Sequence, residues 1–125
     1  MNDVILVVDD SATVRKLVKA SLNLRGFSVA TAANGMEALE KMPFLKVALV
    51  ITDLNMPDMD GFEFIGSLRE IPEHLNTPVI ILTSMTEDSY RLRGFRLGVH
   101  TFLGKPFSAE TILREVTRLL PGGSR

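Results

Sequence analysis

Short runs of consecutive apolar residues alternate along the chain with stretches in which apolar residues recur every three or four positions. The first pattern predicts buried β-strands and the second predicts amphipathic helices. Strands are expected at residues 4–8, 27–33, 48–52, 79–82 and 101–104. Strands that alternate with helices in this way are typical of βαβ units built on a parallel sheet.

Polar and helix-breaking residues mark the expected helix ends. The expected N-caps are Asn34, Asp60 and Ser108, and the expected stops are Gly26, Pro43, Pro72 and Pro121. Glu37 and Glu63 each stand three residues after a cap, which is the spacing of a capping box. The stretch 86–97 is the weakest helix pattern, because Gly94 in its interior costs about 1 kcal/mol relative to Ala.

Polar residues stand at the carboxyl ends of four of the five strands. They are Asp9, Asp10, Asp53, Thr83 and Lys105. Because the carboxyl ends of parallel strands share one edge, where open α/β sheets bind ligands, we expect these residues to form one site. Three crowded carboxylates favour a hard divalent cation, and a hydroxyl and an ammonium group supply donors for an anionic oxygen. The pattern predicts Mg²⁺ and a phosphoryl group, with Asp53 as nucleophile.

Each of these residues also has a purely structural explanation. Asp9 and Asp10 could cap the first helix, Thr83 could simply favour a strand, and Lys105 could lie in a solvated turn. Asp53 is harder to explain structurally, because a carboxylate at the end of an apolar strand is costly to desolvate without a cation. The functional interpretation therefore depends on all five residues together.

Composition restricts the alternatives. The 125 residues and the hydrophobic content of 46% fit one domain with one core. The net charge of −1 gives no argument for direct nucleic-acid binding, and the absence of Cys excludes disulfides, thiolate catalysis and Cys-based zinc sites. No 18-residue apolar run and no signal-peptide pattern occur. We expect a soluble, cytoplasmic protein without membrane insertion.

Four short motifs carry a resemblance to a known family. They are Val7-Val8-Asp9-Asp10, Asp53-Leu54-Asn55-Met56-Pro57 with Asp60-Gly61, Leu82-Thr83-Ser84, and Gly104-Lys105-Pro106-Phe107. Their order and spacing resemble the receiver domain of bacterial two-component response regulators, over residues 4 to about 120. The resemblance implies a single flavodoxin-like (βα)5 domain, a doubly wound parallel sheet with strand order 2-1-3-4-5, as in CheY. We expect the receiver domain at residues 1–121 and a tail at 122–125, either the start of a linker or a cloning remnant.

The same resemblance implies the chemistry. Asp53 would accept a phosphoryl group from the phosphohistidine of a sensor histidine kinase or phosphotransfer protein, and Lys105 would pair with the acyl phosphate. Mg²⁺ would be held directly by Asp10, through water by Asp9, and further by Asp53 and the backbone carbonyl of Asn55. Thr83 would then move toward a phosphate oxygen, and Phe102 would turn inward, as a population shift between two packings.

The resemblance also implies how the signal ends and where it leaves the domain. Asn55 and Met85 would flank the water that hydrolyses the acyl phosphate. Met85 cannot orient a water, so we expect slower autodephosphorylation than in a Met85→Glu variant. The expected output face comprises the fourth helix, the fifth strand and the fifth helix around Phe102. Arg91, Arg93, Arg96, Arg114 and Arg118 would make this face basic. No effector domain follows, so a downstream protein or a domain outside this sequence would receive the signal.

Some positions depart from the usual family pattern. Val99 replaces a common Ala, Phe102 lacks the hydroxyl that many members carry, and the connection Pro43-Phe44-Leu45-Lys46 lacks the usual Pro-Asp pair. None of these positions carries the predicted chemistry. They bear on the output surface and not on the phosphorylation site.

Two other classes of protein share part of the pattern. Phosphatases of the haloacid-dehalogenase type also use an Asp nucleophile, a Thr or Ser, a Lys and an acidic pair, but there the acidic pair comes last. A second Asp also lies two residues after that nucleophile, where this chain has Asn55, so a proton donor for ester turnover is missing. A scaffold without phosphorylation chemistry would not need all five site residues. We therefore expect a phospho-acceptor that catalyses only its own phosphorylation and dephosphorylation.

Overall fold

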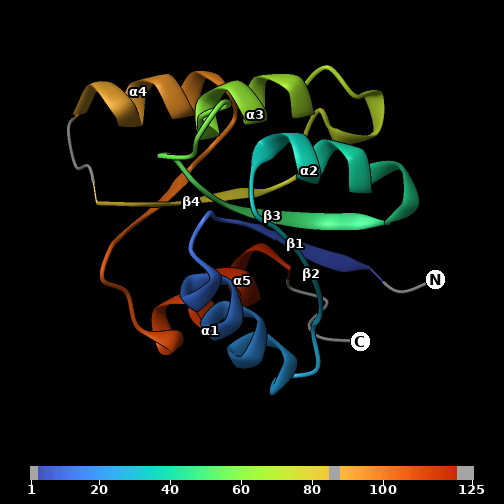
Figure 1. Cartoon of the computed structure of the whole chain (residues 1–125). Helices are drawn as coiled ribbons and strands as arrows, with labels where there is room; N and C mark the ends of the chain where they lie inside the picture. The colour runs from blue at the N-terminus through green and yellow to red at the C-terminus, as the bar shows by residue number, and fades with distance from the viewer. Residues whose placement is uncertain (1–2, 85–87, 121–125) are drawn as a thin grey trace.

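The computed structural model describes residues 3–84 and 88–120, which form a regular alternation of strands and helices (Figure 1). The strands are β1 (Val4–Val8), β2 (Ser28–Ala32), β3 (Val47–Asp53), β4 (Val79–Thr83) and β5 (Thr101–Gly104). The helices are α1 (Ala12–Asn23), α2 (Gly35–Lys41), α3 (Gly61–Leu68), α4 (Asp88–Arg96) and α5 (Ala109–Leu119). Two 3₁₀ turns, η1 (Met42–Phe44) and η2 (Pro72–His74), follow α2 and α3.

The strands form one parallel sheet in the order β2-β1-β3-β4-β5. This order confirms the predicted doubly wound fold. Helices α1 and α5 cover one face of the sheet, and α2, α3 and α4 cover the other (Figure 1). Strands β1 and β3 are therefore central neighbours, and their carboxyl ends lie side by side.

The core consists of two apolar layers, one on each face of the sheet. Successive strand residues point to opposite faces, so that Ile5 packs in the layer with Val18 and Ile112, while Leu6 packs in the layer with Phe64. All of these side chains are almost completely buried. Strand β3 is buried on both faces, as its uninterrupted apolar sequence predicts.

The predicted helix caps are present, with one difference in detail. Asp60 and Glu63 form a complete capping box, with bonds of 2.8 and 3.0 Å. Asn34 accepts the N–H of Glu37 at 2.8 Å, but the Glu37 carboxylate accepts the N–H of Ala33 rather than that of the cap. The second capping box is therefore only half formed.

Helix α3 ends at Leu68, earlier than a stop at Pro72 suggests. A proline disfavours helical geometry in the residue before it, and Ile71 accordingly has an extended backbone with φ −85° and ψ 119°. The N–H groups of Glu70 and Ile71 bond to carbonyls three residues back, which tightens the end of the helix.

Gly94 explains why α4 forms despite its weak sequence pattern. A Cβ atom at this position would collide with the ring of Phe102 in β5. The glycine therefore lowers the intrinsic helix propensity but lets α4 approach the sheet closely over that ring.

Met85, in the segment 85–87 before α4, lies outside the described residues, as does the proposed tail 122–125. In the described segments, no helix is long and apolar enough to span a membrane.

Candidate functional site

The carboxyl ends of β1 and β3 bring three carboxylates together. Val8 of β1 pairs in register with Thr52 of β3, so the residues that follow them are adjacent. One carboxylate oxygen from each of Asp9, Asp10 and Asp53 lies within 4.8 Å of the other two. The predicted acidic cluster is thus formed by backbone topology, which brings Asp53 to a pair of residues more than 40 positions earlier in the sequence (53 minus 10 is 43, and 53 minus 9 is 44).

Asp9 is completely buried, and both of its carboxylate oxygens have partners. Oδ1 accepts the backbone N–H of Ser11 at 2.9 Å, and Oδ2 accepts from Lys105 Nζ at 3.1 Å. The cap of α1 is Ser11, whose hydroxyl accepts the N–H of Val14 at 3.2 Å. The structural explanation, that Asp9 and Asp10 only cap the first helix, is therefore wrong. Asp10 is exposed at the rim of the cluster.

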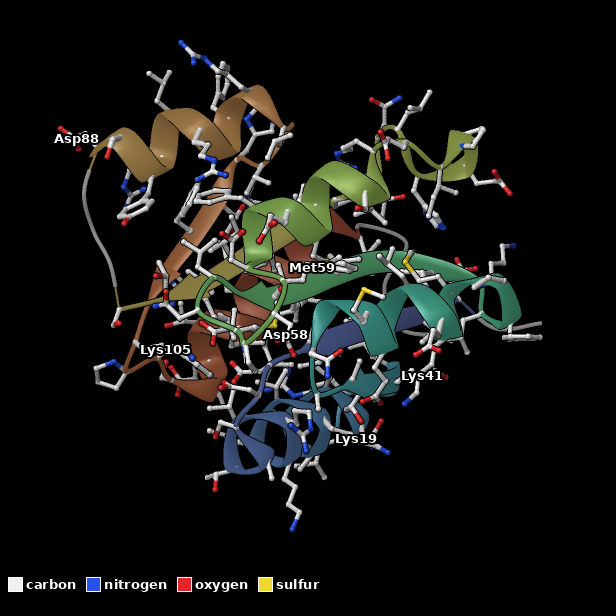
Figure 2. All side chains as sticks on the ribbon, turned by 45° about the horizontal axis from the view of Figure 1, so that its top comes forward. Lys19, Lys41, Asp58, Met59, Asp88 and Lys105 are labelled. Atoms are coloured by element: carbon white, nitrogen blue, oxygen red, sulfur yellow. The ribbon has the colours of Figure 1, made fainter. Side chains whose placement is uncertain are left out.

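Lys105 bridges the two buried carboxylates. Its Nζ lies 3.1 Å from Asp9 Oδ2 and 3.4 Å from Asp53 Oδ1. Burial lowers the pKa of Lys105, but the hydrogen bond to Asp9 and the charges of Asp53 and Asp9 outweigh this effect, so the pKa is raised overall. Lys105 therefore remains an ammonium group and is placed to donate to an anion. Figure 2 shows it at the same end of the sheet as the loop of Asp58 and Met59 that follows β3.

Asp53 is a buried carboxylate in an acidic environment, with 5% of its surface exposed. Burial is the largest influence that raises its pKa, and the charge of Asp9 adds to it. Lys105 and a hydrogen bond from the backbone of Asn55 act in the opposite direction without cancelling the increase. One ammonium group thus contacts two of the three clustered carboxylates, and the cluster keeps an excess of negative charge.

This donor set fits a hard divalent cation. Carboxylate oxygens are the preferred protein ligands of Mg²⁺, and a cation would offset the repulsion that Lys105 leaves uncompensated. Asn55, the predicted carbonyl ligand, is exposed and comes directly after buried Leu54. The loop closes tightly because Gly61 donates to the Leu54 carbonyl at 2.9 Å, and a Cβ on Gly61 would collide with the carbonyl oxygen of Asp53.

Thr83 and Phe102, the two predicted switch residues, lie on the neighbouring strands β4 and β5. Thr83 ends β4, is 2% exposed, and pairs in register with Gly104 of β5. Its carbonyl accepts the backbone N–H of Lys105 at 2.8 Å. Phe102 is half-buried against Gly94 of α4, and the guanidinium carbon of Arg91 lies 5.4 Å from the centroid of its ring. Phe102 is therefore in direct contact with α4, and Thr83 is tied to the end of β5 that follows it.

The structure changes the expected basic output face. Arg93 is exposed on α4, but its guanidinium carbon lies 4.5 Å from the ring centroid of Phe62 in α3, so part of its charge is directed toward α3. Arg118 is partly neutralised by an ion pair with Glu115 at 2.6 Å. Arg96 and Arg114 are exposed. The basic character of the face is therefore weaker than the sequence suggests.

Sequence reasoning missed two contacts that support the site. Arg15 Nη1 donates to the carbonyl of Asp9 at 2.7 Å, which ties α1 to the end of β1. Tyr90 stacks on Phe62 with ring centroids 6.0 Å apart, beside the Arg93 contact. The position of Arg15 one turn into a helix after a strand-end Asp could have indicated the first contact. No local signal joins Phe62 to residues of α4.

A doubly wound parallel sheet with an acidic cluster and a lysine at its carboxyl edge defines the CheY-like class of α/β domains. The model of the response regulator receiver domain matches residues 5–117, and the chain belongs to this family. It is a signalling phospho-acceptor rather than a conventional enzyme, which places it outside the haloacid-dehalogenase phosphatases.

Individual relatives agree with this assignment. The chain is 37% identical to the chemotaxis protein CheY4 of Vibrio cholerae, with a TM-score of 0.90 over 95% of this chain and 99% of that one. A receiver domain of a signal transduction histidine kinase from Syntrophus aciditrophicus is 32% identical, with a TM-score of 0.85 over 96% and 91% of the two chains. The transcriptional regulatory protein SrrA of Staphylococcus aureus is 38% identical over 120 residues, which are 96% of this chain and 48% of SrrA. The chain thus spans about half the length of the curated relatives that it matches.

Proposed function

We propose that this receiver domain accepts a phosphoryl group on Asp53 from the phosphohistidine of a sensor kinase or phosphotransfer protein. The observation that carries the proposal is the placement of Lys105 between Asp9 and Asp53 beside a third carboxylate. An ordinary ion pair needs one carboxylate, whereas this arrangement combines a nucleophile, an anion-binding ammonium group and excess negative charge for a cation. The proposed receiver bounds remain residues 1–121.

In the proposed reaction, a carboxylate oxygen of Asp53 attacks phosphorus. The new P–O bond forms as the P–N bond breaks, and the bonding electron pair returns to the imidazole nitrogen of the donor. The Lys105 ammonium group would stabilise negative charge on the transferred phosphoryl oxygens. Burial of Asp53 keeps its carboxylate poorly solvated, which favours nucleophilic attack once it is ionised.

Asp10, Asp9 and Asp53, with the carbonyl of Asn55, would hold the Mg²⁺ ion. When bound, the ion supplies positive charge that relieves carboxylate repulsion and neutralises phosphoryl oxygens. Asp9 is fixed by Ser11 and Lys105, so it would orient the cluster from the buried side. Exposed Asp10 would contribute from the solvent side.

The phosphorylated state would be read through Thr83 and Phe102. A new anion near β4 would attract the Thr83 hydroxyl, and the shift would change how Phe102 packs on Gly94. Because this ring contacts α4 directly, the populations of α4 positions would change with phosphorylation. A downstream protein would bind the α4, β5 and α5 face, and we place the domain in the cytoplasm without direct contact to nucleic acid or membrane.

Acetyl phosphate tests the proposal without a kinase. Intact-mass spectrometry of the domain incubated with acetyl phosphate should show one added phosphoryl group when Mg²⁺ is present and little without it. The adduct should disappear after mild alkaline treatment, because acyl phosphates hydrolyse there. No adduct with Mg²⁺ present, at any donor concentration, would contradict the proposal.

Met85→Glu is expected to shorten the lifetime of the acyl phosphate. The thioether cannot orient a hydrolytic water, whereas a carboxylate at this position could hydrogen-bond it. We expect the dephosphorylation rate to rise several-fold. This increase should be smaller than the rate enhancement of roughly 100-fold that a fully effective general base provides. Loss of phosphate after donor removal gives the rate. Met85→Leu is the matched control and should leave it unchanged, and a parent that dephosphorylates as fast as Met85→Glu would contradict the assignment.

Reversing Arg96 and Arg114 to Glu is expected to weaken binding of the downstream protein to the beryllofluoride-activated domain. Because these are exposed charges, the effect should be mainly a lower association rate, roughly tenfold at low salt. Surface plasmon resonance at two salt concentrations measures it. The matched control reverses Lys19 and Arg25, which are exposed on the α1 side. Equal loss of binding in both double variants would contradict the proposal that the downstream protein binds the α4, β5 and α5 face.

A further inference from the structure

The segment that departs from the family pattern builds an apolar groove at the end of the sheet opposite the candidate site. This groove, called here the η1 groove, has a volume of about 600 Å³ and lies between η1 and η2. Its apolar lining consists of Leu39, Met42, Pro43, Leu45, Val47 and Ile71. In Figure 1 both turns lie at the same end of the molecule, next to the start of β3.

Phe44 stands beside this groove but does not fill it. Its neighbours Pro43 and Leu45 both line the groove, whereas Phe44 itself is 82% exposed. A projecting aromatic ring next to an apolar depression is typical of a surface that makes contact with another molecule. The fold gives no internal reason for it, since burial of this ring is not used in the core.

The ring and the lining of the groove are both apolar, and both occur on every copy of the chain. We propose that the η1 groove is the contact surface of a symmetric homodimer, in which Phe44 of each copy enters the groove of the other. In a two-fold arrangement one patch can provide both the ring and the groove.

Charge at the rim favours a second copy as the occupant. Lys46 and Glu73 both line the groove, and Glu73 forms no ion pair within the residues that the structure describes. In the described part of the chain, Lys46 forms an ion pair with exposed Asp3, at 3.4 Å. As Lys46 lies two residues after Phe44, insertion of the ring brings Lys46 toward Glu73 of the other copy, and the symmetry repeats this pair. The net charge of −1 opposes association only weakly.

The dimer would leave the signalling surfaces free. The η1 groove lies at the amino ends of the strands, whereas the acidic cluster and Lys105 lie at their carboxyl ends. Phosphorylation and dimerisation can therefore be tested separately, and the failure of one would not imply the failure of the other.

Sedimentation equilibrium of the full chain tests the proposal, up to about 1 mM, the weak end of measurable affinity. The parent should show a reversible monomer–dimer equilibrium. Phe44→Asp should raise the dissociation constant about 30-fold for each ring removed, and so about 1,000-fold for the dimer. Because Phe44 is exposed, the variant should keep its labelling by acetyl phosphate, and its urea midpoint should equal that of the parent at concentrations low enough for both to be monomeric. A parent that is monomeric throughout, or a dimer that survives in Phe44→Asp, would overturn the proposal.

A charge exchange tests the two-fold arrangement itself. Lys46→Glu and Glu73→Lys should each weaken the dimer, and the double variant should restore it, because each exchanged pair is again opposite in sign. A double variant as weak as the sum of the single variants would overturn the arrangement. A parent that stays monomeric while its groove takes up an apolar dye would overturn it too, since the groove would then bind small apolar molecules.

Discussion

Asp53→Asn is expected to abolish covalent labelling by acetyl phosphate. An amide oxygen is a poor nucleophile. Among the carboxylates in residues 3–84 and 88–120, only Asp9 shares with Asp53 both burial and a contact with Lys105, and both oxygens of Asp9 already accept hydrogen bonds. Intact-mass spectrometry with Mg²⁺ measures the loss. Asp58→Asn is the matched control, since Asp58 is exposed in the adjacent loop and its positive φ of 71° suits Asn equally well. Equal labelling of Asp53→Asn and the parent would contradict the assignment.

The same variant has a pH signature. The folded-state pKa of Asp53 is raised above its ordinary value of 3.8, first by burial and then by the charge of Asp9. The folded protein therefore keeps this proton at pH values where the unfolded chain has released it, and stability falls as pH rises through that window. Asp53→Asn removes this loss. Without Mg²⁺, the unfolding free energy of Asp53→Asn relative to that of the parent should therefore increase as pH rises from the unfolded-state pKa to the folded-state pKa of Asp53. Above the folded-state pKa the difference should stay constant.

Asp10→Asn is expected to remove most of the stabilisation by Mg²⁺. If Mg²⁺ binds only the folded state, a concentration about 100 times its dissociation constant adds roughly 2.7 kcal/mol to the parent. The variant should gain much less at the same concentration, because one carboxylate of the cluster is neutral. Its apo form should be more stable than the parent by less than about 1 kcal/mol, since Asp10 is exposed. Urea unfolding with and without Mg²⁺ measures both effects.

Asp9 is not expected to behave like Asp10. Its carboxylate holds Lys105 and the N–H of Ser11, so Asp9→Asn would remove an ion pair as well as a repulsion. The apo gain that neutralisation alone would predict is therefore not expected for Asp9→Asn. Asp58→Asn again serves as control, and an equal Mg²⁺ effect in Asp10→Asn and Asp58→Asn would show that the acidic cluster is not the metal site.

Most of the fold was predictable because local and long-range signals agree. The apolar runs gave all five strands, and strand alternation with helices gave the parallel sheet. The strand-end residues Asp9, Asp53 and Lys105 were predicted to meet because parallel strands share one carboxyl edge, and they do. The complete capping box at Asp60 followed from spacing alone.

The remaining features depend on tertiary contacts that no local pattern encodes. Gly94 counts against a helix until the ring of Phe102 is placed against it. The sequence indicates only that Arg93 is one of several surface charges, but in the structure its guanidinium group lies over the ring of Phe62 in α3. Asp9 and Asp10 likewise differ in environment because Lys105, which follows β5, pairs with Asp9. Asp9 is buried and Asp10 is exposed, and no local pattern predicts this difference. The roles of Thr83 and Asn55 and the tuning by Met85 stay predictions.

The most direct test of the central claim is to map the acyl phosphate chemically. Borohydride reduces an aspartyl phosphate to homoserine, so treatment of the labelled domain followed by peptide sequencing by mass spectrometry reports which side chain carried the phosphoryl group. We expect homoserine at position 53 in the sample labelled with Mg²⁺ and none in a sample labelled after chelation. Homoserine at position 9 or 10, or a label at 53 that does not depend on a divalent cation, would contradict the central claim.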